Sequence, residues 1–113
     1  MKIRELLSYI NEVKPNPFQD SVLLLWLNEL EGRIQLDILL RGRDETVSYV
    51  LPGDSETELL VKAPHSAIYR LWLQAMIDRG NGEAETYQNS MAAFNKAWNA
   101  YACWHAETQG GNS

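Results

Sequence analysis

The chain has 113 residues, of which 45% are hydrophobic and 22% charged, with a formal net charge of −5 and a pI near 4.9. This length suits one domain with a modest core, and the acidic balance disfavours sequence-specific nucleic-acid binding and attachment to an anionic membrane. The single cysteine, Cys103, excludes an intrachain disulfide and a multi-cysteine metal site. The N-terminus lacks the continuous apolar run of a signal peptide, and no apolar run is long enough to span a bilayer, so we expect a cytoplasmic protein.

Two amphipathic helices are expected in the first forty residues. The first has its apolar positions at Ile3, Leu6, Leu7, Ile10 and Val13, and the prolines at positions 15 and 17 end it. Asp20 or Ser21 is a suitable N-cap for the second helix. The apolar stripe of that helix consists of Leu23, Trp26, Leu27, Leu30, Ile34 and Ile38. Because the stripe stays in phase beyond Gly32, we expect the helix to run on to about Leu40.

The pattern changes from helical to alternating after residue 45. Val47, Tyr49 and Leu51 fall on one side of residues 46–51, which is typical of a strand. The run PGD at 52–54 favours a turn, and residues 58–62 then provide a partner strand. The sequence thus predicts a small hairpin over about residues 46–62. A hairpin alone is marginal, so it must lie on the helices or join a neighbouring subunit.

Two further helices follow. The third is expected to begin with Pro64 in its first turn and to end at a left-handed cap supplied by Gly80 or Gly82. The fourth is expected to run to about Glu107 with one stripe at Tyr87, Met91, Phe94, Trp98, Tyr101 and His105. The fold is therefore expected to be mainly α: a four-helix bundle-like domain over residues 1–108 with a long C-terminal helix, followed by a flexible tail over residues 109–113.

Catalytic and metal-binding patterns are not evident. Cys103 and His105 stand two residues apart and do not face each other on a helix, so Cys103 is interpreted as a small buried thiol. The two histidines, His65 and His105, lack the spacing of a metal site. Glu29 and Glu31 are also two apart and are interpreted as part of a solvated face. We therefore expect no catalytic, cofactor or metal residues, and no enzymatic activity.

The remaining candidates are interaction residues. The aromatic stripe of the fourth helix is expected to be core, with a subunit or partner interface as the alternative, since Trp and Tyr are favoured in both places. The basic cluster near the end of the second helix is either a solvated helix end or a docking site for an acidic partner. The candidate interface residues are Arg33, Arg41, Arg43, Tyr49, Trp98, Tyr101 and Trp104.

Three parts of the chain carry a resemblance to known proteins. They are WLNELEGRIQ at 26–35, then ELLV at 58–61 with Ala63, Pro64, Tyr69, Trp72, Leu73, AMID at 75–78 and NGE at 81–83, and finally Tyr87, NSM at 89–91, Phe94, Asn95, Tyr101 and Trp104. With these residues, over about positions 14–108, the chain resembles small proteins from the structural-gene clusters of long-tailed phages and prophages. These proteins resemble head–tail connector (adaptor) proteins.

The resemblance implies a mostly helical, non-enzymatic subunit that binds beneath the portal ring in the host cytoplasm and remains at the head–tail interface of the virion. Many copies would form a ring that extends the DNA channel and offers a docking surface to the next connector or tail protein, although a free copy could be monomeric. Residues 46–62 and the C-terminal tail would supply adaptable contacts. A second class of function stays open: a small regulatory or protein-binding module of phage origin that sequesters one soluble partner.

Overall fold

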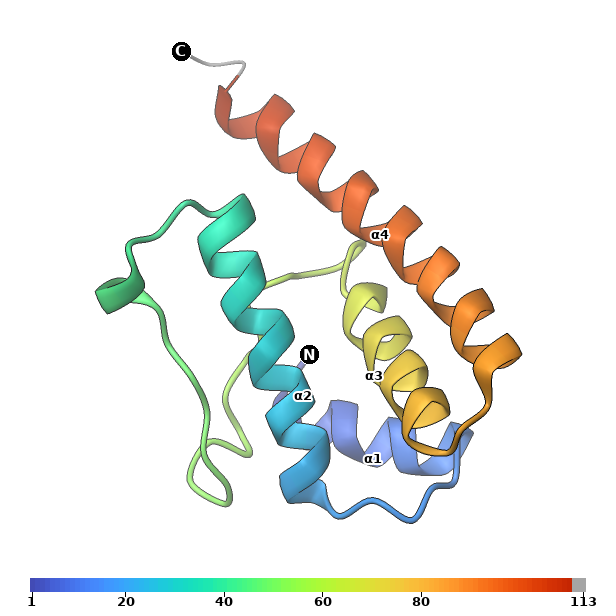
Figure 1. Ribbon diagram of the computed structural model, residues 1–113. Helices are drawn as coiled ribbons and strands as arrows, with labels where there is room; N and C mark the ends of the chain where they lie inside the picture. The colour runs from blue at the N-terminus through green and yellow to red at the C-terminus, as the bar shows by residue number, and fades with distance from the viewer. Residues whose placement is uncertain (111–113) are drawn as a thin grey trace.

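Four α-helices form the protein in the computed structural model, which describes residues 1–110, with only the backbone described at 109 and 110 (Figure 1). The elements are α1 (Ile3–Val13), α2 (Asp20–Arg33), the π-helical turn η1 (Ile34–Ile38), the short 3-10 helix η2 (Arg43–Glu45), α3 (Ala67–Gly80) and α4 (Ala84–Gly110). The predicted mainly helical, bundle-like fold is confirmed. The central helix is α3, which contacts α1, α2 and α4.

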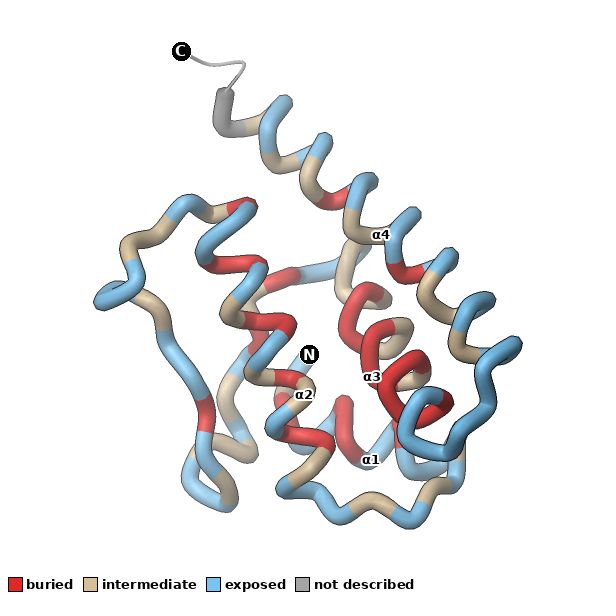
Figure 2. Tube along the Cα trace, in the orientation of Figure 1, coloured by how far each residue is buried: buried red, intermediate tan, exposed pale blue. Residues whose placement is uncertain are grey.

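The core lies around α3, where most residues are buried (Figure 2). From α1 it receives Ile3, Leu6, Leu7 and Ile10, as the helical spacing predicts. Val13, the last member of the predicted face, is 47% exposed because the helix ends there, beyond the neighbouring helices. Apolar burial of this kind is the main source of the free energy of folding.

An ion pair with a buried carboxylate links the chain after α1, the end of α3 and the start of α4. The Asp78 carboxylate of α3 is fully buried and contacts the ammonium group of Lys14, which follows α1. Its other oxygen accepts a hydrogen bond from the Ser90 hydroxyl of α4 at 3.0 Å. The pairing compensates the desolvation of the carboxylate, so this link depends on Lys14 remaining in place.

The second helix runs through Gly32, as predicted, and then widens into η1. The N–H of Leu39 donates to the C=O of Ile34, and that of Arg41 donates to the C=O of Gln35, both at 2.9 Å. Leu40, between them, has a φ of 56°. The start of the helix differs from the prediction, because the N-cap is Gln19 and Asp20 is already the first helical residue.

The predicted hairpin over residues 46–62 is wrong. No strand is assigned among residues 1–110; residues 46–50 run beside α2 as an extended chain, and residues 51–56 form a turn (Figure 1). The one β-bridge in this described part joins Glu58 to Lys2 at the N-terminus. Residues 57–59 are held there by hydrogen bonds between the N–H of Ile3 and the C=O of Thr57, and between the N–H of Leu59 and the C=O of Met1, each 3.0 Å.

The ends of α3 and α4 differ slightly from the expected positions. Pro64 lies three residues before α3, in a turn in which the N–H of His65 donates to the C=O of Lys62, so its predicted place in the first helical turn is wrong. Gly82 has a φ of +73° and supplies the predicted left-handed residue. The backbone of α4 stays helical to Gly110, three residues past the expected end. Residues 111–113 of the expected tail lie outside the described part.

The aromatic stripe of α4 faces α3, and its predicted core role is confirmed for Phe94 and Tyr101, which are buried. Tyr87, Met91 and Trp98 of the same stripe are partly buried against the core. The last turns of α4 extend beyond α3 (Figure 1). One face of this helix therefore serves the fold, and its C-terminal end is left at the surface.

Candidate functional site

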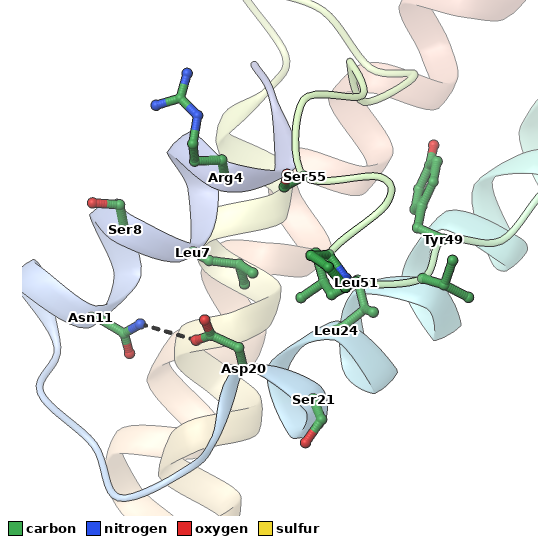
Figure 3. A pocket seen from close by; sticks show the side chains of 12 residues that line it. Arg4, Leu7, Ser8, Asn11, Asp20, Ser21, Leu24, Tyr49, Leu51 and Ser55 are labelled. Atoms are coloured by element: carbon green, nitrogen blue, oxygen red, sulfur yellow. Dashed lines mark hydrogen bonds between the residues drawn. The ribbon is translucent and has the colours of Figure 1, made fainter.

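An apolar hollow lies between α1, the start of α2 and the chain at 49–55, and we name it the α1–α2 groove (Figure 3). Its volume is about 790 Å³. Leu7, Leu24 and Leu51 provide apolar walls, and polar side chains surround them. The full lining is Arg4, Leu7, Ser8, Asn11, Asp20, Ser21, Leu24, Tyr49, Val50, Leu51, Pro52 and Ser55. A hollow with apolar walls and a polar rim is typical of a binding site.

The two charged residues of the α1–α2 groove differ in their pairing. Arg4 is engaged by Glu56, whose carboxylate accepts from the Arg4 guanidinium at 2.7 Å and from the Lys2 ammonium at 3.0 Å. These two cations lower the pKa of Glu56 from 4.5 to about 2. Asp20 accepts only a long hydrogen bond of 3.4 Å from Asn11, and no described residue forms an ion pair with it. Asp20 is thus the charge that remains available to a partner.

The segment over residues 46–51, whose last three residues line the groove, is fixed to α2 and η1 by two side-chain amides. Asn28 accepts from the N–H of Tyr49 at 2.9 Å and donates to its C=O at 3.0 Å. Gln35 does the same for Val47, at 2.8 and 2.9 Å. Each amide therefore makes the pair of hydrogen bonds that a residue of a neighbouring strand makes in a β-ladder. The extended segment needs no partner strand on this side. The predicted partner strand is also occupied, because residues 57–59 bond to the N-terminus and the N–H of Leu60 bonds to Glu31, so no hairpin forms.

A buried carboxylate lies between the two amides on α2. Glu31 is fully buried and accepts hydrogen bonds from the hydroxyls of Tyr49 and Tyr69, both at 2.7 Å, and from the N–H of Leu60 at 3.1 Å. The Tyr69 hydroxyl in turn accepts from the N–H of Val61 at 2.8 Å. These donors replace the water that the carboxylate loses on burial. Glu31 therefore connects α2 to α3 and to two points of the long connection, Tyr49 and Leu60.

Burial and Glu31 together raise the pKa values of the nearby tyrosine hydroxyls. Burial, and then the hydrogen bond to Glu31, raise the pKa of Tyr49 above its usual value of 10.0. Burial, and then the charge of Glu31, raise the pKa of Tyr69 in the same direction, and the same two causes raise that of Tyr101. A tyrosine whose pKa is raised is a poor proton donor near neutral pH. The arrangement is suited to holding the chain in place rather than to moving protons.

A second hollow, the α2–α4 groove, lies at the other end of the same helix. Its volume is about 630 Å³, and its lining is Asp37, Ile38, Leu39, Leu40, Ala102, His105 and Ala106. Leu40 is 79% exposed and holds the left-handed conformation that usually belongs to glycine. A non-glycine residue in this conformation, with a large apolar side chain in solvent, is a candidate for a contact residue.

The candidate interface residues of α4 are used largely within the chain. The guanidinium of Arg33 lies 4.9 Å from the ring of Trp98 and 5.9 Å from that of Trp72. Trp98 is partly buried and Tyr101 is buried. Trp104, which lies 5.1 Å from the ring of His65, is 44% exposed and is the aromatic side chain of this group that faces solvent most.

The other predicted interface residues lie on or beside α2. Tyr49 is 6% exposed, with its hydroxyl bound to Glu31. Arg41 donates to the side-chain oxygen of Gln35 at 3.0 Å. Arg43 is exposed. The structure therefore places Tyr49 inside the molecule and gives Arg33 and Arg41 partners within the chain.

Sequence reasoning missed the polar row on α2, and its assignment of Glu31 to a solvated face is wrong. Asn28, Glu31 and Gln35 are spaced by three and four residues, so they share one face of the helix, beside the apolar stripe. That spacing was the available signal. It was not decisive because a glutamate on a helix is normally solvated unless partners compensate its burial.

Among the described residues, no three His, Cys, Asp or Glu residues gather as a metal site would require. None of the helices in this part of the chain combines the length and apolar character needed to cross a membrane. Comparisons of the chain with models of protein families, with curated proteins and with solved structures found no match.

Proposed function

We propose that this chain is a non-enzymatic phage virion assembly protein, a head–tail connector (adaptor) that docks on the portal ring and on neighbouring connector or tail proteins. The proposal takes its family from the sequence resemblance. The observation that supports it is the position of the two grooves at opposite ends of the α2–η1 helix, lined by residues 20–24 at one end and 37–40 at the other. That helix separates them by roughly 25 Å. A connector needs two separate docking faces, one for each neighbour.

Each face carries apolar side chains that the fold does not use. Val50 is 66% exposed at the α1–α2 groove, and Leu40 is exposed at the α2–α4 groove. Exposed apolar side chains beside a hollow are favourable in a complex, because docking removes their surface from water. On this proposal the subunit acts in the host cytoplasm during assembly and remains at the head–tail junction of the virion, where copies form a ring.

Light scattering of the protein alone, and mixed with its cognate portal ring, tests the proposal. We expect a free monomer that joins the portal in many copies. Leu40→Asn and Val50→Asn should weaken this association, whereas Leu25→Asn, which changes an exposed leucine outside both grooves, should not. A protein that stays free beside intact portal rings would contradict the proposal. Such a result, with a one-to-one complex with a soluble partner, would favour the regulatory module.

A further inference from the structure

The extended segment over residues 46–51 has one occupied edge and one free edge. Because the N–H and C=O groups of Val47 and Tyr49 bond to the amides of Gln35 and Asn28, those of the alternate residue Ser48 point the opposite way. Within the described chain, neither backbone group of Ser48 has a hydrogen-bond partner, and the residue is exposed. Thr46 likewise has no backbone hydrogen bond there. The segment is thus half of a β-ladder.

The free edge lacks the usual protection against strand addition. Proteins usually guard such an edge with charged residues, a proline or a covering element. Residues 46–51 contain no charged residue and no proline, and three of the six are valine or tyrosine, which favour extended structure. In Figure 1 the segment forms the outer border of the molecule beside α2. Its conformation is already fixed by α2, so a pairing strand would not have to order it.

The α1–α2 groove begins where the free edge ends. Tyr49, Val50 and Leu51 belong to both the segment and the groove lining (Figure 3). Beyond residues 46 and 48, where it would pair, a partner strand would pass Val50 and Leu51, which line the groove together with Leu7 and Leu24. The backbone pairing of such a strand would end at Val50, because both backbone groups of Val50 are already bonded to Asp54. The Val50 N–H donates to the Asp54 carboxylate and the Val50 C=O accepts from the Asp54 N–H, both at 2.8 Å. Asp20 then offers a carboxylate with no cation beside it.

We propose that this edge and the α1–α2 groove together bind an extended segment of a partner protein, apolar at alternate positions and carrying one Lys or Arg that reaches Asp20. Backbone hydrogen bonds to Ser48 would supply part of the affinity, and the apolar walls would supply the selection of side chains. The proposal rests on the proposed function only for the source of the segment, which would be a neighbouring virion protein.

The test is a selection of random twelve-residue peptides on the full-length protein, followed by affinity measurement of the enriched peptides. We expect a consensus of alternating apolar residues with one basic residue. Ser48→Pro removes an N–H that no described group uses and should weaken peptide binding by about tenfold or more, whereas the matched control Ser48→Ala should bind as wild type. Asp20→Asn should lower the affinity for the peptides that contain the basic residue and leave peptides lacking it unaffected.

Two outcomes overturn the proposal: no consensus is enriched, or Ser48→Pro binds the enriched peptides as tightly as wild type. If Ser48→Pro does not fold, Val50→Asn, which changes an exposed side chain at the junction of edge and groove, takes its place with the same criterion. If light scattering instead finds a dimer that Ser48→Pro abolishes, and no peptide is enriched, the occupant is a second copy and the partner named here is wrong. Portal binding without any peptide consensus would retain the proposed function and reject this site.

Discussion

The hydroxyl of Tyr69 donates to the buried carboxylate of Glu31 at 2.7 Å and accepts the backbone N–H of Val61 at 2.8 Å. One oxygen atom of α3 therefore links α2 to the connection that precedes α3. The Tyr49 hydroxyl makes only the bond to Glu31. The two tyrosines consequently differ in what their removal leaves unpaired.

Tyr69→Phe should lower the free energy of unfolding by about 2–4 kcal/mol, since Glu31 loses a donor and the Val61 N–H is left buried without an acceptor. Tyr49→Phe should lower the free energy of unfolding by about 1.5–3 kcal/mol, because it removes a donor to Glu31 but leaves no N–H without an acceptor. Tyr101→Phe is the control, as its hydroxyl has no hydrogen bond in the described structure, and it should change stability by less than about 0.5 kcal/mol. Urea unfolding of the three variants gives the order. Equal losses for all three would contradict the central place of Glu31.

Leu40→Gly should stabilise the protein, which is unusual for the loss of a large apolar side chain. Leu40 has a φ of 56° and is 79% exposed, so glycine relieves strain and forfeits little buried surface. The strain is about 1–2 kcal/mol and the greater freedom of glycine in the unfolded chain offsets part of it, leaving a gain of about 0.5–1 kcal/mol.

The matched variant Leu40→Ala shortens the side chain and keeps the strain. Its stability should stay within about 0.5 kcal/mol of wild type. Thermal unfolding of both variants separates the effect of backbone conformation from that of the side chain. If Leu40→Gly lowers the stability and Leu40→Ala does not change it, the left-handed conformation of Leu40 does not strain the backbone.

Glu56 should contribute to stability only above its depressed pKa. Its pKa is about 2 in the folded protein against 4.5 ordinarily, because of Arg4 and Lys2. The contribution is therefore complete above pH 4.5 and is lost as the pH falls towards 2. The melting temperature of Glu56→Gln should lie below that of wild type at neutral pH and converge with it near pH 2. Since these groups are exposed, 1 M salt should reduce the difference.

The control for the pH profile is Glu29→Gln, a change at an exposed carboxylate in the middle of α2 that has no ion pair within the described residues. Its melting temperature should follow that of wild type at every pH. A constant offset between Glu56→Gln and wild type down to pH 2 would mean that the residue acts through packing and not through its charge.

The helices could be predicted from the sequence because each has to bury one face. The spacing of apolar residues in α1, α2 and α4 predicts that buried face directly. In α2 the same spacing also predicts that the helix continues past Gly32, where helix propensity alone would predict its end. The widening into η1 and the left-handed Leu40 could not be predicted, since no apolar spacing and no glycine marks either of them in the sequence.

The hairpin was mispredicted for a related reason. Alternation at residues 46–51 reports an extended chain correctly but does not say what pairs with it. In the folded protein the partner is a helix, through Asn28 and Gln35, and no residue pattern within the segment itself encodes that. Glu31 was misassigned because its donors come from Tyr49, Leu60 and Tyr69, which are 18 to 38 residues away in the chain.

Arg33 and Trp98 should be energetically coupled. The guanidinium lies 4.9 Å from the Trp98 ring, where a cation–π contact contributes about 0.5–1 kcal/mol. Trp98→Ala alone should cost about 2–3 kcal/mol, somewhat less than a fully buried tryptophan, because the ring is only partly covered. A double-mutant cycle with Arg33→Ala, read from urea unfolding, should return the coupling.

The matched cycle combines Trp98→Ala with Arg43→Ala, since Arg43 is an exposed residue of η2. The effects of these two substitutions on the free energy of unfolding should add within about 0.3 kcal/mol. The comparison decides which arginine is available to a partner. Coupling at Arg33 means that its guanidinium is held on the aromatic side chains of α3 and α4, while Arg41 is held by Gln35, so an acidic partner would meet Arg43 first. An absence of coupling would mean that the Arg33 guanidinium is not held by Trp98. Arg33 would then be available, with Arg43, to bind an acidic partner.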